Sequence, residues 1–287
     1  MDSGISLCDA KPQAIVLPIR IQEDSRFSGI GLAFHFLLGN VLVLCTRLKE
    51  MWFGWRVKAI FPKKETLLSF CRGEGSEPNI GDLGAEQKIR YWFSGHIAKQ
   101  EAIITLTDTE VKRVWVNSIP FSMLDHHIGF RNTFLEWIET CGISFAEMER
   151  RKALWPEKLP LEGLDAVGRA LLAFYLFSSY QSETDLNVEA IATASKKYPF
   201  SYMARNLLGW VRYRRAEYDS AKTAFLEAVN LNQAGAGAMA GLMWCSVMMN
   251  QQKDAIDWAA SKAETQGEAV EAAKEKAMHL INRQKKT

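Results

Sequence analysis

The residues best suited to chemistry in this chain include a short run at Asp125, His126 and His127. A carboxylate beside imidazole groups can transfer protons near neutral pH, because histidine titrates in that range. Neighbouring residues of a helix point about 100° apart, so the two histidines are poorly placed to hold one metal ion. The first turn of a helix with an acidic N-cap is the favoured interpretation, and an exposed acid–base cluster is the alternative.

The other candidates for chemistry also have structural explanations. His35 lies in an apolar segment, where it is either a pH-sensitive switch or, as favoured, a hydrogen-bonded core histidine. Asp108 and Glu110 resemble paired catalytic carboxylates, but they fall in a predicted hairpin turn, where acidic residues are common. The sequence has no glycine-rich phosphate loop, HExxH zinc motif or GxSxG nucleophile motif. We therefore predict no catalytic residue, no metal site and no cofactor, in a protein that is not an enzyme.

Composition limits the partners and the location of the protein. The 287 residues include 35 basic and 33 acidic side chains, and the net charge of +2 argues against nucleic acid or a membrane surface as partner. The five cysteines are odd in number, and no two have the spacing of a metal-binding or redox pair. We expect free thiols in a reducing compartment, no secretory signal at the amino terminus, and a cytoplasmic protein.

One segment tests the expectation that the protein is soluble. Residues 27–46 contain no charge, and 20 such residues are long enough to cross a bilayer. The segment also contains His35, Asn40 and three glycines, and it lies between two predicted strands. A buried core helix is favoured, and a membrane segment is the alternative.

The spacing of apolar residues along the sequence predicts the helices and strands that position these side chains. Residues 14–19 and 57–61 are short apolar runs typical of buried strands, and Pro62 is well placed to begin a helix that reaches Cys71. Residues 89–97, 102–106 and 111–119 alternate apolar with polar side chains, which predicts three antiparallel strands. A helix between Asp125 and Gly142 follows. We expect a flexible segment at 1–13 and one α/β domain with a mixed sheet at 14–145.

The second half of the chain contains only helical patterns and one repeat. Residues 202–235 place small Gly209 and Ala221 and large Leu208 and Phe225 where two antiparallel helices would approach closely. A shift of 34 residues gives a second unit, residues 166–199 a divergent third, and residues 268–283 a terminal capping helix. We predict a linker at 146–165 and an all-α repeat domain at 166–287. The fold class is α+β, with the mixed-sheet domain first.

Two family resemblances follow from these residues. Residues 202–235 look like a member of the tetratricopeptide repeat family. Residues 14–142 resemble the N-terminal domain of TolB, through AIVLPI at 14–19 and YWFSGHI at 91–97 with the strands after it. In some bacterial proteins such a domain precedes such repeats, including regulators and cyclases with a separate effector domain. The resemblance implies scaffolding or sensing through protein binding, with catalysis in another domain.

The repeat also predicts a binding surface. In the tetratricopeptide fold the first helix of each pair lines a concave groove, and its outward positions are Asn206, Trp210, Tyr213 and Arg214, then Trp244, Val247 and Met248. Aromatic side chains and arginine are common at binding hot spots, and methionine suits an adaptable surface. We expect a protein or peptide partner with apolar or aromatic side chains. The alternative is that these side chains pack against a neighbouring helix.

A second apolar patch lies at residues 51–55, with the sequence MWFGW. If exposed, it is an interaction surface; if buried, as favoured, it fastens the first helix to the sheet.

The leading functional hypothesis is a cytoplasmic adaptor or scaffold that holds a protein partner in the repeat groove. The alternatives are a regulatory module whose α/β domain binds a small molecule, and a membrane-anchored accessory protein that uses residues 27–46. The sequence leaves assembly into a homo- or hetero-oligomer open.

Overall fold

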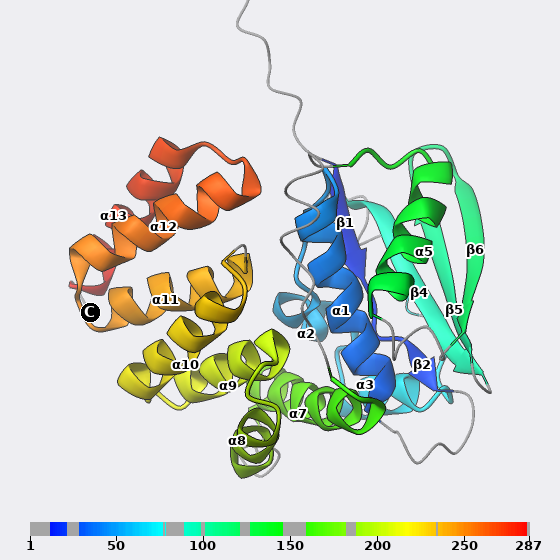
Figure 1. Ribbon diagram of the computed structural model, residues 1–287, viewed down its shortest axis with the longest axis horizontal. Coiled ribbons are helices and arrows are strands. Elements are labelled where there is room, and N and C mark those ends of the chain that lie inside the picture. The colour runs from blue at the N-terminus through cyan, green and yellow to red at the C-terminus, as the bar shows by residue number, and fades with distance from the viewer. Residues whose placement is uncertain are drawn as a thin grey trace, which may run out of the picture.

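The computed structural model describes residues 12–21, 29–76, 78, 89–98, 101–120, 127–145, 159–181, 188–233 and 235–285. An N-terminal mixed sheet with helices is followed by a run of packed antiparallel helix pairs, so the predicted α+β class is confirmed (Figure 1). The outer edge of the described sheet lies on the far side of the molecule from the last helix pairs (Figure 1).

The sheet combines parallel and antiparallel strands. Its strands are β1 (Gln13–Val16), β2 (Arg20–Ile21), β3 (Lys49–Glu50), β4 (Ile89–Ala98), β5 (Glu101–Asp108) and β6 (Arg113–Pro120). The order is β3-β1-β4-β5-β6, with β2 also paired to β4. Strand β1 runs parallel to β3 and β4, whereas β4, β5 and β6 form the predicted antiparallel meander.

The prediction of a strand at residues 57–61 is wrong. Val57–Ile60 form a short helix, α2, which follows directly on the 3₁₀ turn η1 (Phe53–Trp55). The amide of Phe61 donates to the carbonyl of Val57, which closes a helical turn. An apolar run of five residues fits a buried strand and a buried helical turn equally well, so its periodicity could not distinguish them.

Helices cover the sheet on both faces. On one face, Val16 and Phe93 pack with α1 (Ile30–Cys45) and α5 (His127–Thr140). On the other face, Ile15 and Trp92 belong to a core that also includes α2, α3 (Lys64–Cys71) and α7 (Leu161–Tyr180). The helix predicted after Pro62 is therefore present as α3.

Helix α1 is buried from two sides, which explains why it has no polar face. Phe34 and Leu38 pack toward the sheet, whereas Ala33 and Leu37 belong to the core shared with α7. The predicted core helix at residues 27–46 is thus confirmed for the part that the structure describes. Among the described helices, none is long and apolar enough to cross a bilayer.

From α9 onward, the second half of the chain advances in steps of 34 residues. Its helices are α7, α8 (Val188–Lys197), α9 (Tyr202–Arg214), α10 (Tyr218–Leu231), α11 (Ala236–Met248), α12 (Gln252–Gln266) and α13 (Val270–Gln284). Helices α9, α11 and α13 begin at 202, 236 and 270, and α10 and α12 begin at 218 and 252. Ala216 and Asn250 have the same left-handed turn conformation 34 residues apart. Helix α7 begins within the segment predicted as a linker.

Small residues allow the helix pairs to interlock, as predicted. A methyl group on Gly209 would lie 2.5 Å from the ring of Phe225, and one on Gly241 would lie 2.3 Å from the same ring. Phe225 on α10 is therefore held between the first helices of two successive pairs. Ala221 and Ala228 on the same helix are also buried.

Candidate functional site

The α/β domain and the helix pairs share a continuous core. The amide of Gly29, at the start of α1, donates to the buried carboxylate of Asp165 on α7 over 2.6 Å. Arg169, one turn further along α7, forms an ion pair with the same carboxylate. Because α1 and α7 meet here at backbone distance, the start of the helical region is fixed against the sheet domain.

The MWFGW segment at residues 51–55 forms the second connection. Phe53 is fully buried, as predicted, beside the rings of His35 and Tyr175. The half-buried ring of Trp52 lies 5.8 Å from the rings of both Phe174 on α7 and Trp210 on α9. As expected, Phe53 fastens the first helix to the sheet, because it contacts His35 of α1 and shares a core with Ile15 of β1. Trp52 in addition fastens the sheet domain to the helix pairs.

Two residues of the predicted groove, Trp210 and Asn206, are buried, which corrects the prediction at these positions. Trp210 is only 6% exposed, because Trp52, Tyr213 and Phe225 surround its ring. Asn206 is 2% exposed. The repeat register placed both residues on the inner face of α9, but it could not show that Trp52 of the sheet domain covers Trp210. Nor could it show that the side chain of Asn206 lies against Gly237 at the start of α11. Neither side chain lies open to a partner.

The remaining predicted positions form the candidate binding surface, defined by Tyr213, Arg214, Trp244 and Met248. All four are partly exposed, whereas their predicted neighbour Val247 is buried. Burial raises the pKa of Tyr213 to about 12 and lowers the pKa of Arg214. The phenol therefore stays neutral at physiological pH. Aromatic rings, thioethers and guanidinium groups are side chains that can bind apolar or aromatic partners.

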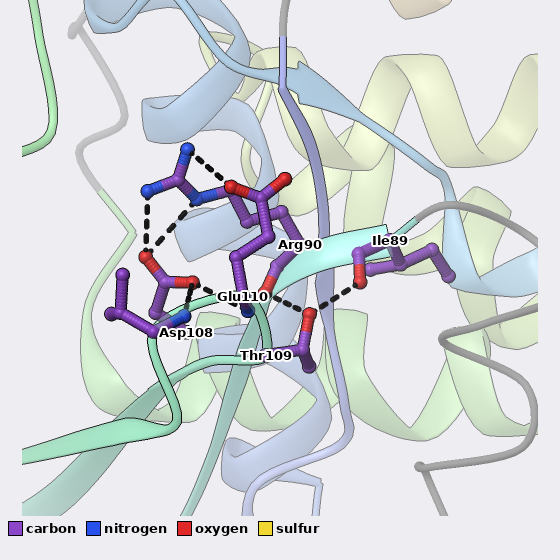
Figure 2. Close-up of polar contacts among 6 residues, drawn as sticks. Ile89, Arg90, Asp108, Thr109 and Glu110 are labelled. Atoms are coloured by element: carbon purple, nitrogen blue, oxygen red, sulfur yellow. Dashed lines mark hydrogen bonds and ion pairs between the residues drawn. The ribbon is translucent and has the colours of Figure 1, made fainter.

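The predicted pair of carboxylates is a structural cluster (Figure 2). Asp108, at the buried end of β5, accepts hydrogen bonds of 3.0 and 2.9 Å from the guanidinium of Arg90. Its second oxygen accepts from the amides of Glu110 and Val111, and Glu110 forms an ion pair with Arg90. Burial acts to raise the pKa of Asp108, but these hydrogen bonds outweigh it and lower the pKa. The ionised group closes the hairpin and is not placed to exchange protons at neutral pH.

His35 is a hydrogen-bonded core histidine, the favoured interpretation. Its Nε2 lies 2.8 Å from the hydroxyl of Tyr175, so the pair joins α1 to α7. Burial lowers the pKa of His35 to about 3. The ring is therefore neutral near physiological pH, and it does not switch there.

Replacing His35 with leucine is expected to flatten the loss of stability in acid. In the wild type, the unfolded histidine binds a proton below its ordinary pKa of 6.5, whereas the folded ring does so only near 3. The contribution of this histidine to the free energy of unfolding is complete above pH 6.5. It falls by about 1.4 kcal/mol for each pH unit between pH 6.5 and pH 3. Urea unfolding at several pH values between 7 and 4 checks this; identical slopes for wild type and His35→Leu would contradict it.

The remaining candidates for chemistry are the histidine run at 126–127 and the cysteines. His127 begins α5, but its side chain, like Asp125 and His126, lies outside the described residues. Burial raises the pKa of Cys71 and Cys245 to about 12, which keeps both thiols protonated and unreactive. Within the described ranges, no group of three histidine, cysteine or acidic side chains is placed to hold a metal ion.

Comparison of the chain with models of protein families, with curated proteins and with solved structures finds no match.

Proposed function

We propose that the chain is a non-catalytic adaptor that holds a protein partner on the candidate binding surface. The observation that carries the proposal is the contrast between two equivalent tryptophans. Trp210 and Trp244 stand 34 residues apart at the same position of α9 and α11. The first is sealed by Trp52 of the sheet domain, whereas the second is partly exposed.

The contact that covers Trp210 indicates what kind of side chain the exposed Trp244 can bind. Trp52 reaches Trp210 from a short loop segment before η1, with the two rings tilted by 35°. A partner that presents an aromatic side chain from a loop or an extended segment could meet Trp244 in the same way. Met248, one turn further along α11, provides an adaptable apolar contact, and Arg214, at the end of α9, provides a cation. Such residue types carry much of the energy of protein interfaces.

The proposal includes assignment of the helix pairs to the tetratricopeptide type and of the sheet domain to the TolB N-terminal type. The 34-residue step and the glycine contacts around Phe225 support the first assignment. The order of elements that begins with the AIVLPI segment supports the second. The buried free thiols at Cys45, Cys141 and Cys245 are compatible with a cytoplasmic location. The sheet domain acts as a rigid support that fixes the orientation of the helix pairs.

A site-specific crosslinking experiment tests the proposal. A photoreactive phenylalanine analogue placed at Met248 is expected to give a discrete adduct with one protein in cells. The same analogue at Met278 is the control, because Met278 is an exposed apolar residue on α13, outside the candidate binding surface. Once the adduct identifies the partner, Trp244→Ala should weaken its binding by roughly tenfold or more, as for an interface hot spot.

Leu226→Ala provides the matched control for binding, since Leu226 is an exposed apolar residue on α10. Its affinity for the partner should equal that of the wild type. Equal crosslinking from positions 248 and 278, or full affinity in Trp244→Ala, would exclude the candidate binding surface.

A further inference from the structure

Strand β6 ends the sheet and is paired on one side among the described residues. It pairs with β5 along its whole length, from Arg113 opposite Asp108 to Pro120 opposite Glu101. Figure 1 shows β6 at the outer edge of the sheet, with no described element beyond it. A strand in this position presents backbone amides and carbonyls that can bind another strand.

The hairpin that contains β6 also exposes apolar side chains. Val111, Val114 and Val116 are 59%, 58% and 62% exposed. Natural sheets usually guard such an edge with charged residues or prolines inside the strand. Here Arg113 and Pro120 stand at the two ends of the strand, and the six positions between them carry no charge. Strand β6 is therefore suited to pairing rather than protected against it.

We propose that β6 pairs antiparallel with β6 of a second copy of this chain, with Trp115 opposite Trp115 at a two-fold axis. In this register Val114 of each copy lies opposite Val116 of the other, so four exposed valines form one cluster on the open face of the sheet. Cross-strand pairs of β-branched residues stabilise antiparallel sheets. Placing Val116 on the axis would instead set Val114 against Ser118.

The charges at the two ends of β6 favour the same arrangement. Lys112 precedes the strand, and in this register it lies opposite Ser118 of the second copy. The hydroxyl of Ser118 donates to the carboxylate of Glu101 over 2.5 Å. Lys112 of each copy therefore approaches Glu101, which lies on β5 of the other copy beside Ser118, and the two-fold axis repeats this favourable contact. Opposite charges across neighbouring strands are stabilising, and like charges are avoided. This complementarity of the strand with itself is why the proposed occupant is a second copy.

Sedimentation of the full chain tests whether the edge forms a dimer. The wild type is expected to sediment as a dimer at micromolar concentration, and Val116→Lys is expected to weaken the dimer by about a hundredfold or more, because two charges would enter the cluster. Met278→Lys is the control for an added surface charge and should remain a dimer. Thermal unfolding shows that both variants fold. A monomeric wild type, or a dimer unaffected by Val116→Lys, would overturn the proposal.

Cysteine crosslinking tests the register. Because Val114 faces Val116 of the other copy, a mixture of Val114→Cys and Val116→Cys chains should form disulfide-linked dimers on mild oxidation. Either variant alone should crosslink no more than the wild type, since identical positions would be about 8 Å apart, too far for a disulfide. Crosslinking of Val116→Cys alone, or none in the mixture, would overturn the proposed register. Capture of a different protein by both cysteines would replace the second copy with that partner.

Discussion

Replacing Gly168 by alanine is expected to destabilise the folded chain by about 3 kcal/mol or more. Gly168 lies on α7 where this helix crosses the start of α1. A methyl group there would stand 1.7 Å from the carbonyl oxygen of Gly29 and 3.0 Å from the amide of Ala33. Both are backbone atoms, which cannot move aside as the end of a flexible side chain could. The two helices would have to separate, and the bond from Gly29 to Asp165 would stretch.

Gly163→Ala on the same helix is the matched control. The added methyl group there would meet only side-chain atoms of Leu159 and Tyr198, at 3.0 to 3.2 Å. Alanine also favours a helix over glycine by about 1 kcal/mol, so the expected change in stability is small and of either sign. Urea unfolding followed by circular dichroism compares the two variants. If Gly168→Ala is as stable as Gly163→Ala, the close crossing of α1 and α7 is wrong.

Replacing Trp52 by alanine is expected to cost about 3 kcal/mol, as for other large aromatic residues in a core. The ring lies against Phe174 and Trp210, so its removal would leave a cavity at the junction of the sheet domain and the helix pairs. Trp210 should also become accessible, because Trp52 covers its ring. Urea unfolding measures the first effect, and acrylamide quenching of tryptophan fluorescence in native buffer measures the second.

A double-mutant cycle shows whether the two tryptophans act together. The combined variant Trp52→Ala/Trp210→Ala should be less destabilised than the sum of the single variants, by about 0.5 to 1.5 kcal/mol. Trp137 on α5 provides the control, since it packs against the other core cluster. Its cycle with Trp52 should be additive. Additivity in both cycles would mean that Trp52 does not seal the first repeat position.

The patterns along the chain predicted most of the elements correctly for a local reason. The alternation at 89–119 gave the antiparallel meander, because side chains of a strand point to opposite faces in turn. The small and large residues at 202–235 gave the helix pairs, because Gly209 and Phe225 meet only at one spacing. Each of these signals lies within a single element or between two adjacent ones.

Local patterns failed where the outcome depended on a distant part of the chain. The run at 57–61 was predicted as a strand, but Val57–Ile60 form helix α2, and the place beside β1 is taken by strand β3 at Lys49–Glu50. Strand β6 alternates valine with Trp115 and Ile119, so apolar residues on both faces were already visible in the sequence. Only the order of the strands showed that β6 is the last strand of the sheet among the described residues, with its valines exposed.

The sequence by itself determined the α+β class, the meander and the 34-residue step of the helix pairs, because these depend on neighbouring residues. Only the tertiary structure decided which side chains of the inner face stay open. Trp210 and Trp244 occupy equivalent repeat positions, yet the first is sealed by Trp52 and the second is partly exposed. The difference arises from packing between segments far apart in the chain, and no periodicity along the chain encodes such a contact.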